Sequence, residues 1–350
     1  MAIILPTSTT SASTVITDTD VTNGDLLWVR DDVDLVSTAS DGIDISIQNL
    51  DLRIDGDVVA NRYGVSMDSF AVDTDYDYRL SLGETANVTS NTRFALYLGT
   101  NLTNTDLAFG NISVTNAGEV TAFDRGAVLL FYANQAVFSN SGSVITHATT
   151  SYFDAAVSIY SIKDSSFDNS GLIQRMHDTV GSSQHIAAVS FFGGVQSVSA
   201  TNSGRIISSH IAFYSDATVS ETLANSGQII GDVELSDTVG GTFKNFGFVD
   251  GNVNTAGGND IVTNSGSISG VLDLGTGDDT YTASNTGLVS GGILGGSGND
   301  TLTGGENADF MDGGDDNDRL FGRGGDDDLR GGLGSDFMSG GMGDDQVIGD

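Results

Sequence analysis

The chain of 350 residues contains no cysteine, one proline and four histidines, and it has only 13 lysines and arginines against 47 aspartates and glutamates. The absence of cysteine excludes a disulfide framework. The shortage of basic residues leaves a formal net charge of −34. Such an acidic surface repels phosphate groups and anionic lipids, so we expect neither nucleic acid nor a membrane surface as a partner.

Long apolar runs are also missing. The N-terminal residues MAIILP have no basic region, and their apolar stretch is too short for the core of a signal peptide. No window approaches the roughly 20 apolar residues that a transmembrane helix needs. The sequence therefore predicts no membrane span and shows no N-terminal targeting segment.

Two common catalytic signatures are absent. A zinc peptidase would need His-Glu-x-x-His, but His147, His177, His185 and His210 do not have this spacing and none has a glutamate beside it. A lipase-like Gly-x-Ser-x-Gly elbow is missing as well, because the stretch Gly291–Gly295 lacks the serine. We expect these histidines to be exposed or packed in the core.

Glycine is abundant, with 47 residues, and it is organised most clearly at the C-terminal end. From Gly295 onward six nonapeptides follow one another: GGSGNDTLT, GGENADFMD, GGDDNDRLF, GRGGDDDLR, GGLGSDFMS and GGMGDDQVI. The sixth place is always aspartate: Asp300, Asp309, Asp318, Asp327, Asp336 and Asp345. The eighth place is always aliphatic: Leu302, Met311, Leu320, Leu329, Met338 and Val347.

This spacing has a physical interpretation. A glycine-rich turn lets backbone carbonyls point inward, and each turn adds one carboxylate, which together give the all-oxygen shell that a hard divalent cation prefers. The aliphatic eighth residue belongs to a short strand that can bury its apolar face only against neighbouring repeats. Asn307 and Asp316 stand where the fourth glycine is missing, and both residue types tolerate a left-handed backbone, so we expect the turns to be preserved.

The repeat closely resembles the RTX (hemolysin-type) calcium-binding nonapeptide GGxGxDxUx, a parallel β-helix repeat. The resemblance implies two nonapeptides per coil, with several Ca²⁺ ions between same-side loops of successive coils. It places Asp300, Asp318 and Asp336 in one stack and Asp309, Asp327 and Asp345 in the opposite one. It further implies that the following loop residues belong to the metal sites: Gly296, Gly298, Gly305, Asn307, Gly314, Asp316, Gly325, Gly332, Gly334, Gly341 and Gly343.

Two departures from this pattern weaken single sites. Arg323 replaces the second glycine of its nonapeptide, and Asn307-Ala308 makes the second loop atypical.

The resemblance also bears on localisation. RTX-like proteins commonly leave Gram-negative bacteria through a type I system that reads an uncleaved C-terminal signal, and this chain stops inside a seventh repeat, so we expect it to be part of a longer protein. The repeat segment carries 14 acidic residues against three arginines. Self-repulsion on this scale opposes folding until cations bind, so we expect the chain to fold on calcium after export.

A second repeat, Asn-x-Gly, runs through the middle of the chain with spacings of 19 to 33 residues. A valine or isoleucine follows four places after each asparagine, which indicates strand, tight turn and strand. The spacing suits one coil of a β-solenoid, and we expect the asparagines to form a ladder at one corner; unrelated turns of a β-sandwich are the alternative. The asparagines are Asn116, Asn140, Asn169, Asn202, Asn225, Asn245, Asn264 and Asn285.

The two repeats merge. Asp260 and Asp279 lie in glycine-rich turns and precede Asp300 by 40 and 21 residues, so coil length tightens towards 18. We predict them as further calcium ligands, with plain turns as the alternative. The predicted fold class is all-β: a right-handed parallel β-helix that ends in an RTX calcium β-roll, in which a second calcium corner replaces the Asn-x-Gly corner from about Asp309 onward.

We predict three regions: a β-rich N-terminal or capping region (1–105), coils with Asn-x-Gly corners (106–294) and the RTX roll (295–350). In the first region, Ile43–Ile47, Leu50–Ile54 and Phe94–Leu98 alternate apolar and polar residues as half-buried strands do. These strands are either early coils or a cap.

The functional prediction is a secreted calcium-binding β-solenoid with a structural or adhesive role, whose partners are calcium and surface glycans or other cell-surface proteins. The alternative is a carbohydrate-active enzyme resembling polysaccharide lyases or alginate epimerases, for which Asp73–Arg79 and Lys163 with Asp164 are the candidate residues. A glycan-binding module, with Trp28, Tyr76 and Tyr78 stacking on sugars, lies between them. No catalytic residue is assigned.

Overall fold

The computed structural model describes residues 2–5, 9–11, 16–17, 26–45, 49–69, 76–100, 110–148, 155–160, 162–176 and 187–349. These residues form strands and turns but no helix, and hence no helix that could span a membrane. They divide into two compact units. Unit 1 comprises residues 1–196 and 206–209, and unit 2 comprises 197–205 and 210–350. The three regions predicted from the sequence remain a prediction.

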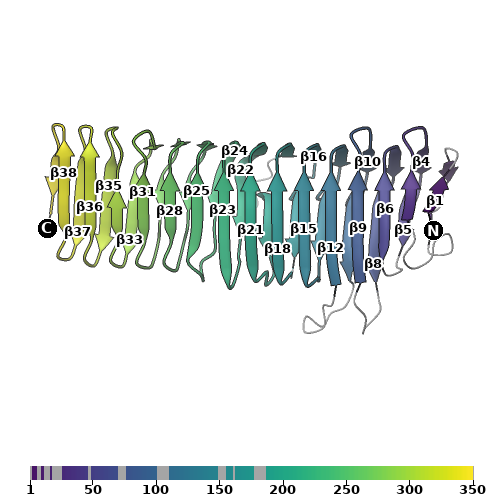
Figure 1. Cartoon of the computed structure of the whole chain (residues 1–350), viewed down its shortest axis with the longest axis horizontal. Coiled ribbons are helices and arrows are strands. Elements are labelled where there is room, and N and C mark those ends of the chain that lie inside the picture. The colour runs from purple at the N-terminus through teal and green to yellow at the C-terminus, as the bar shows by residue number, and fades with distance from the viewer. Residues whose placement is uncertain are drawn as a thin grey trace. The chain divides into compact units, whose positions relative to one another are not determined.

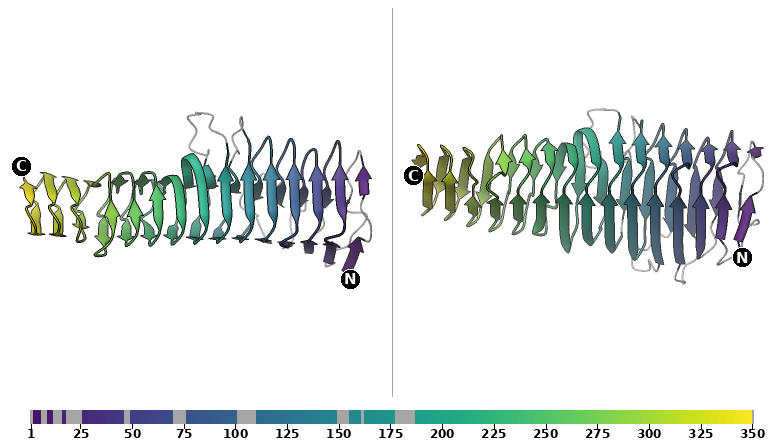
Figure 2. Two further views of the ribbon diagram at one scale, coloured as in Figure 1. Left: turned by 90° about the horizontal axis from the view of Figure 1, so that it is seen from above. Right: turned by 45° about the horizontal axis from the view of Figure 1, so that its top comes forward.

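Unit 1 is built from coils whose strands pair in parallel with the equivalent strands of the next coil (Figures 1 and 2). One sheet runs through β1 (Ala2–Leu5), β3 (Leu26–Val29), β6 (Leu50–Ile54), β9 (Tyr76–Leu82), β12 (Gly110–Asn116), β15 (Gln135–Asn140) and β18 (Asp164–Asn169). The next strand of each coil is β2 (Thr9–Ser11), β4 (Asp34–Ser37), β7 (Asp57–Ala60), β10 (Asn87–Ser90), β13 (Glu119–Ala122), β16 (Ser143–Thr146) or β19 (Leu172–Arg175). The third is β5 (Ile43–Ile45), β8 (Val65–Ser69), β11 (Leu96–Thr100), β14 (Val128–Phe131), β17 (Val157–Tyr160) or β20 (Ala187–Phe192).

Unit 2 has the same construction. Its first sheet runs through β21 (Ser197–Asn202), β23 (Ser220–Asn225), β25 (Gly241–Asn245), β28 (Ile261–Asn264), β31 (Thr280–Ala283), β34 (Thr301–Thr303), β36 (Arg319–Gly324) and β38 (Phe337–Met342). The other strands are β22 (Arg205–Ser215), which has residues in both units, β24 (Gln228–Glu234), β26 (Phe248–Asp250), β27 (Val253–Asn254), β29 (Ser267–Ile268), β30 (Leu272–Asp273), β32 (Leu288–Val289), β33 (Ile293–Ser297), β35 (Phe310–Asp315), β37 (Asp328–Leu333) and β39 (Gln346–Ile348).

Each unit is therefore a right-handed parallel β-helix, as the sequence predicts, and unit 2 ends in the nonapeptide coils. The early alternating segments are coils of unit 1, because β6 pairs with β3 and β9, and β11 pairs with β8 and β14. In the nonapeptides the register advances by 18 residues per coil, as in the pairing of Arg319 with Phe337.

Alternate residues of the strands point inward and stack on their equivalents in the next coil. In unit 1, Phe138 lies in register with Phe167, and their rings stack at 5.8 Å. In unit 2 a buried column runs from Leu223 through Phe243, Val262 and Tyr281 to Leu302. This burial of apolar side chains supplies the main favourable contribution to folding of each coil.

The Asn-x-Gly corner forms a ladder of buried amides in each unit, as predicted. The Nδ2 atom of Asn116 donates to Oδ1 of Asn140, and that of Asn140 donates to Oδ1 of Asn169, both at 2.8 Å. In unit 2 the same bonds link Asn202, Asn225, Asn245 and Asn264 at 2.8 to 2.9 Å.

The eighth asparagine is not part of this ladder. Ala283, not Asn285, lies in register with Asn264, and Asn285 is exposed. The coil after Asn264 is longer than the one before it, so the motif is displaced from the corner by two residues. The expectation that all eight asparagines stack is therefore wrong for the last one.

Candidate calcium centre

The aspartates of the sixth repeat position form two columns. In one, the Oδ1 atom of each aspartate accepts a hydrogen bond from the backbone N–H of the aspartate one coil earlier. The donor and acceptor pairs are Asp260 and Asp279 at 2.7 Å, Asp279 and Asp300 at 2.8 Å, Asp300 and Asp318 at 2.8 Å, and Asp318 and Asp336 at 3.0 Å. Asp260 and Asp279 thus belong to the same column as the nonapeptide aspartates.

The second column comprises Asp309, Asp327 and Asp345. The N–H of Asp309 donates to Oδ1 of Asp327 at 2.8 Å, and the N–H of Asp327 donates to Oδ1 of Asp345 at 3.2 Å. The two stacks predicted from the repeat therefore both form, and the second one begins at Asp309, where the asparagine ladder has ended.

One carboxylate oxygen of most of these aspartates has no partner although it is buried. These atoms are Oδ2 of Asp260, Asp279, Asp300, Asp318 and Asp327, and Oδ1 of Asp309. The six side chains are between 1 and 3% exposed. Because buried polar atoms nearly always have a hydrogen-bond partner, a regular row of unpartnered anionic oxygens indicates a missing cation.

Burial has a strong electrostatic consequence in this row. Desolvation raises the pKa of Asp260 and Asp300 to about 7 and that of Asp279 and Asp318 to about 6, and neighbouring aspartates raise these values further. Desolvation also raises the pKa of Asp309 and Asp327. The negative charges are therefore costly in the folded chain without a counter-ion.

The glycines permit the turns that hold these carboxylates. The second repeat place has positive φ at Gly296, Gly314, Gly332 and Gly341, and the fourth has it at Gly298, Gly325, Gly334 and Gly343. Only glycine adopts this backbone without strain. In addition, a Cβ atom at Gly296 would collide with the carbonyl oxygen of Gly275 on the previous coil.

The substitutes for these glycines behave differently from one another. Asp316 adopts a φ of 80°, as expected, but Asn307 does not enter the left-handed region, so that expectation is wrong. The loop of Asn307 is atypical in another respect, because the N–H of Gly305 donates to Oδ2 of Asp309 within the same turn at 2.9 Å. Arg323 keeps the left-handed turn, with a φ of 73°.

The first glycine of each nonapeptide has a role that we did not predict. A Cβ atom at Gly295 would collide with Oδ2 of Asp300 and with the carbonyl oxygen of Gly313 on the next coil. The equivalent collisions with the aspartate occur at Gly304, Gly313, Gly322, Gly331 and Gly340. The repeat contained the signal, since the first place is always glycine, but only the folded coil shows that it leaves space for the carboxylate.

These residues fit a calcium ion. Among the described residues no three histidine, aspartate or glutamate side chains converge on one point, so an ion here must be held partly by backbone carbonyls. The carboxylate of Asp300 and the carbonyl of Gly313 border the same space beside Gly295. All donors are oxygen atoms, which is the ligand type that Ca²⁺ prefers.

The comparison with known families agrees with this chemistry. Residues 293–320 and 321–350 match the RTX calcium-binding nonapeptide repeat (4 copies). This segment consists of RTX repeats and binds calcium. No curated protein and no solved structure matches the chain. The individual ligands, including Asp260 and Asp279 upstream of the matched RTX segment, remain a prediction.

The residues considered for sugar chemistry do not form a comparable site. Tyr78 is fully buried, whereas the adjacent Arg79 is exposed and lies within 3.3 Å of Oδ1 of Asp51. The expectation that Tyr78 is exposed is therefore wrong. Residues 73–75 and the side chain of Tyr76 lie outside the described part of the chain.

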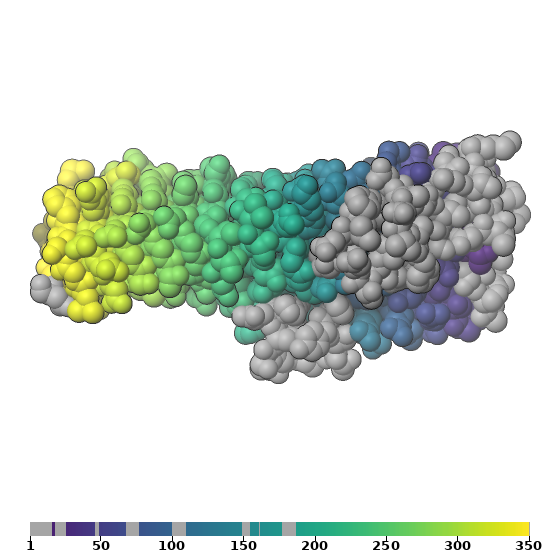
Figure 3. Space-filling model, turned by 90° about the horizontal axis from the view of Figure 1, so that it is seen from below, coloured from purple at the N-terminus to yellow at the C-terminus, as the bar shows by residue number. Residues whose placement is uncertain are grey.

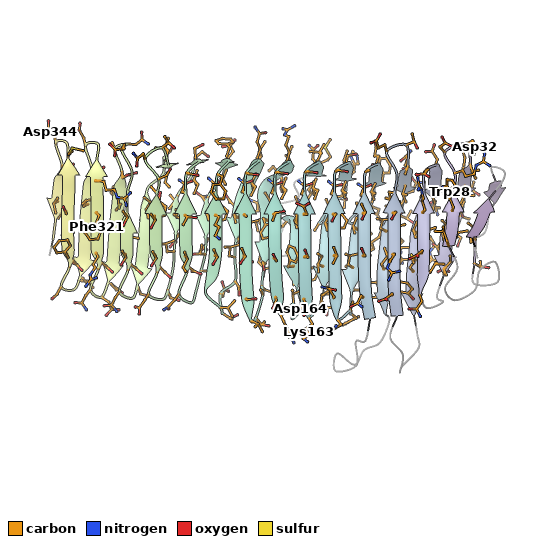
Figure 4. All side chains as sticks on the ribbon, viewed as in Figure 1. Trp28, Asp32, Lys163, Asp164, Phe321 and Asp344 are labelled. Carbon is orange, nitrogen blue, oxygen red and sulfur yellow. The ribbon has the colours of Figure 1, made fainter. Side chains whose placement is uncertain are left out.

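Lys163, Asp164 and Trp28 belong to other surfaces of unit 1 (Figure 4). Lys163 and Asp164 are exposed at a turn and at the start of β18. Trp28 packs under Arg53, whose guanidinium lies 5.2 Å from the ring, and its Nε1 donates to Oδ2 of Asp55 at 2.8 Å. One face of the Trp28 ring is thus already covered.

Of the four histidines, two are described. His147 stacks on Phe123 with ring centroids 5.0 Å apart, and His210 is exposed. His177 and His185 lie outside the described residues.

Proposed function

We propose that this protein is an extracellular or cell-surface β-helical scaffold with a structural or adhesive role, which becomes rigid when calcium binds. The observation that carries the proposal is the row of buried aspartates with unpartnered oxygens, from Asp260 to Asp327. Since the fold places these charges one coil apart, it needs cations between them. Calcium would then act as a condition for folding of the RTX coils.

Export follows from the same coupling. A chain with a net charge of −34 and uncompensated buried carboxylates has little tendency to fold in a calcium-poor cytosol. It can therefore pass a type I exporter as an unfolded polypeptide and fold outside, where calcium is abundant. We propose this route because it is typical of proteins with RTX repeats.

The adhesive part of the proposal rests on an aromatic row in unit 1. Tyr97 lies 4.7 Å from the ring of Tyr63 and 4.5 Å from that of Phe131, and Tyr132 lies 5.2 Å from Tyr160. The four tyrosines are only partly buried. Partly exposed aromatic rings with polar hydroxyl groups are favourable contacts for a glycan or for another protein.

The folding claim is tested by circular dichroism and limited proteolysis of the whole chain, with EGTA and with millimolar Ca²⁺. We expect calcium to increase the β-strand signal and to protect residues 260–350 from cleavage, whereas magnesium at the same concentration has a much smaller effect. An unchanged strand signal and an unchanged cleavage pattern would contradict calcium-coupled folding.

The adhesive claim needs a separate measurement, namely binding of the calcium-loaded chain to bacterial cells and to immobilised glycans. A variant with Tyr97→Ala and Tyr132→Ala should lose binding, and Phe123→Ala, which removes an exposed aromatic ring outside the row, should retain it. Equal binding by both variants would exclude the aromatic row. The alternative of a polysaccharide lyase or epimerase is tested by unsaturated-product assays on alginate and pectin.

A further inference from the structure

The aspartate column continues upstream of the RTX repeats. The N–H of Gly241 in β25 donates to Oδ1 of Asp260 at 2.6 Å, which is the bond that links the other members of the column. Gly241 in turn lies in register with Glu221 of β23, and the two strands are neighbours in Figure 1. Glu221, Gly241 and Asp260 thus occupy equivalent positions in three successive coils of unit 2.

Glu221 is an unusual residue for the interior of a β-helix. Its side chain is 3% exposed, and its Oε1 atom is buried without a partner. Its Oε2 atom accepts a hydrogen bond from the N–H of Ser236 at 2.9 Å. Ser236 belongs to the same coil as Gly241, so the longer glutamate side chain places its carboxylate one coil further along the column.

Gly241 leaves the space between the two carboxylates open. An ideal Cβ atom built at Gly241 would lie 3.5 Å from Oδ1 of Asp260 and 4.0 Å from Oε2 of Glu221. Both acidic groups therefore border the same space, one from each side. Gly241 is not among the residues with positive φ, so its backbone does not require glycine.

The charges around this space are of one sign. Burial raises the pKa of Glu221 to about 7, although Ser215 and Ser236 donate hydrogen bonds to it, and Asp216 raises the pKa further. Asp279 and Glu221 likewise raise the pKa of Asp260. Among the described residues neither Glu221 nor Asp260 forms an ion pair with a basic side chain.

We propose that Glu221 and Asp260 hold a further divalent cation, of the calcium type, beside Gly241 and outside the RTX repeats. The two carboxylates supply oxygen ligands from both sides, and water completes the shell of a cation that needs six to eight oxygens. This site extends the metal column two coils upstream of Asp279. It requires neither export nor adhesion, so it stands independently of the proposed function.

The test is the number of Ca²⁺ ions bound per chain, measured by equilibrium dialysis and elemental analysis on the whole protein. Glu221→Gln keeps the acceptor for the N–H of Ser236 but removes the charge. Gly241→Ala fills the space with a methyl group at ordinary van der Waals distances from both carboxylates. We expect each variant to bind one ion fewer than the wild type.

Two controls separate this site from the RTX sites. Glu84→Gln, which removes an exposed charge in unit 1, should bind as many ions as the wild type. Both site variants should retain the calcium-induced increase in strand signal, since the ions of residues 293–350 remain. An unchanged ion count in Glu221→Gln and Gly241→Ala would overturn the proposal and would assign the space to a shared proton.

Discussion

Asp318 uses its two carboxylate oxygens for different purposes. Oδ1 accepts a hydrogen bond from the backbone N–H of Asp300 at 2.8 Å, and Oδ2 is buried without a partner. The first oxygen joins two coils whether or not a metal is present. The second is the oxygen that we expect a cation to take, and this division leads to the first prediction.

Asp318→Asn should leave the calcium-free fold intact and weaken calcium binding. The amide keeps an Oδ1 acceptor for Asp300, and its loss of charge removes a desolvation cost. Calcium at 100 times its dissociation constant stabilises a protein by about 2.7 kcal/mol per site, so we expect the variant to lose about that much of the calcium-dependent stability. Thermal melts with and without calcium measure the difference.

The control for this variant is Asp315→Asn, which makes the same charge change at an exposed position of the same nonapeptide. Its calcium-dependent increase in Tm should equal that of the wild type. Equal losses in both variants would mean that net charge, and not a site at Asp318, determines the calcium response.

The asparagine ladder predicts a contrast between two identical substitutions. Asn225→Ala removes the bond to Asn245 and leaves the Nδ2 of Asn202 without its acceptor at a buried position. Because unsatisfied buried groups cost about 1–3 kcal/mol each, we expect a loss of about 3 kcal/mol in the free energy of unfolding. Chemical denaturation in saturating calcium measures it.

Asn285→Ala tests whether that cost comes from the ladder. Asn285 is exposed and out of register, so its replacement should change stability by less than about 0.5 kcal/mol. A large effect at Asn285, or a small one at Asn225, would contradict the assignment.

The calcium-free protein should be more stable in mild acid than at neutral pH. The pKa values of Asp279 and Asp318 are raised to about 6 and those of Asp260 and Asp300 to about 7, so the folded state binds more protons than the unfolded state. This contribution is fully present below the ordinary aspartate pKa of about 4 and is lost as pH rises through 6 to 7.

Melting temperatures in EGTA at pH 5 and pH 8 test this dependence, and we expect the higher value at pH 5. The Asp318→Asn variant should show a smaller difference between the two pH values, since one titrating group is gone. If the difference is unchanged in the variant, the pH dependence comes from the general negative charge of the chain.

Arg323→Gly should stabilise the RTX coils. Arg323 has a φ of 73°, and the left-handed conformation costs a non-glycine residue about 1–2 kcal/mol. Glycine removes this strain, so we expect the free energy of unfolding to rise by about 1 kcal/mol in saturating calcium.

Arg330→Gly is the matched control, because it makes the same charge change in the same nonapeptide. Arg330 has no positive φ, pairs with Asp328 at 3.0 Å and lies 4.8 Å from the ring of Phe310. Its replacement should lower stability. A rise in both variants would indicate that the loss of a positive charge is responsible.

The surface shows why exposure was harder to predict than the columns. Side chains of unit 2 pack closely over the face seen in Figure 3. In unit 1 the alternation of β9 places Tyr78 inside and Arg79 outside. The run of acidic and aromatic residues around Tyr78 did not reveal this phase, because the residues before it carry no clear period.

The sequence alone determined the metal, the fold class and the two aspartate stacks of the nonapeptides. It could do so because a repeat of constant length superimposes equivalent residues without knowledge of anything else in the chain. From Asp300 to Asp345 two repeats make one coil, and the spacing of 18 residues is the register itself.

Only the tertiary structure decided which residues meet where the coils vary in length. Asn285 leaves the ladder, the row of Tyr63, Tyr97 and Tyr132 forms across coils of different lengths, and Glu221 reaches Asp260 past Gly241. In such coils the register depends on how many residues each turn accommodates outside the sheets. That number is set by the packing of the whole coil and cannot be counted along the chain.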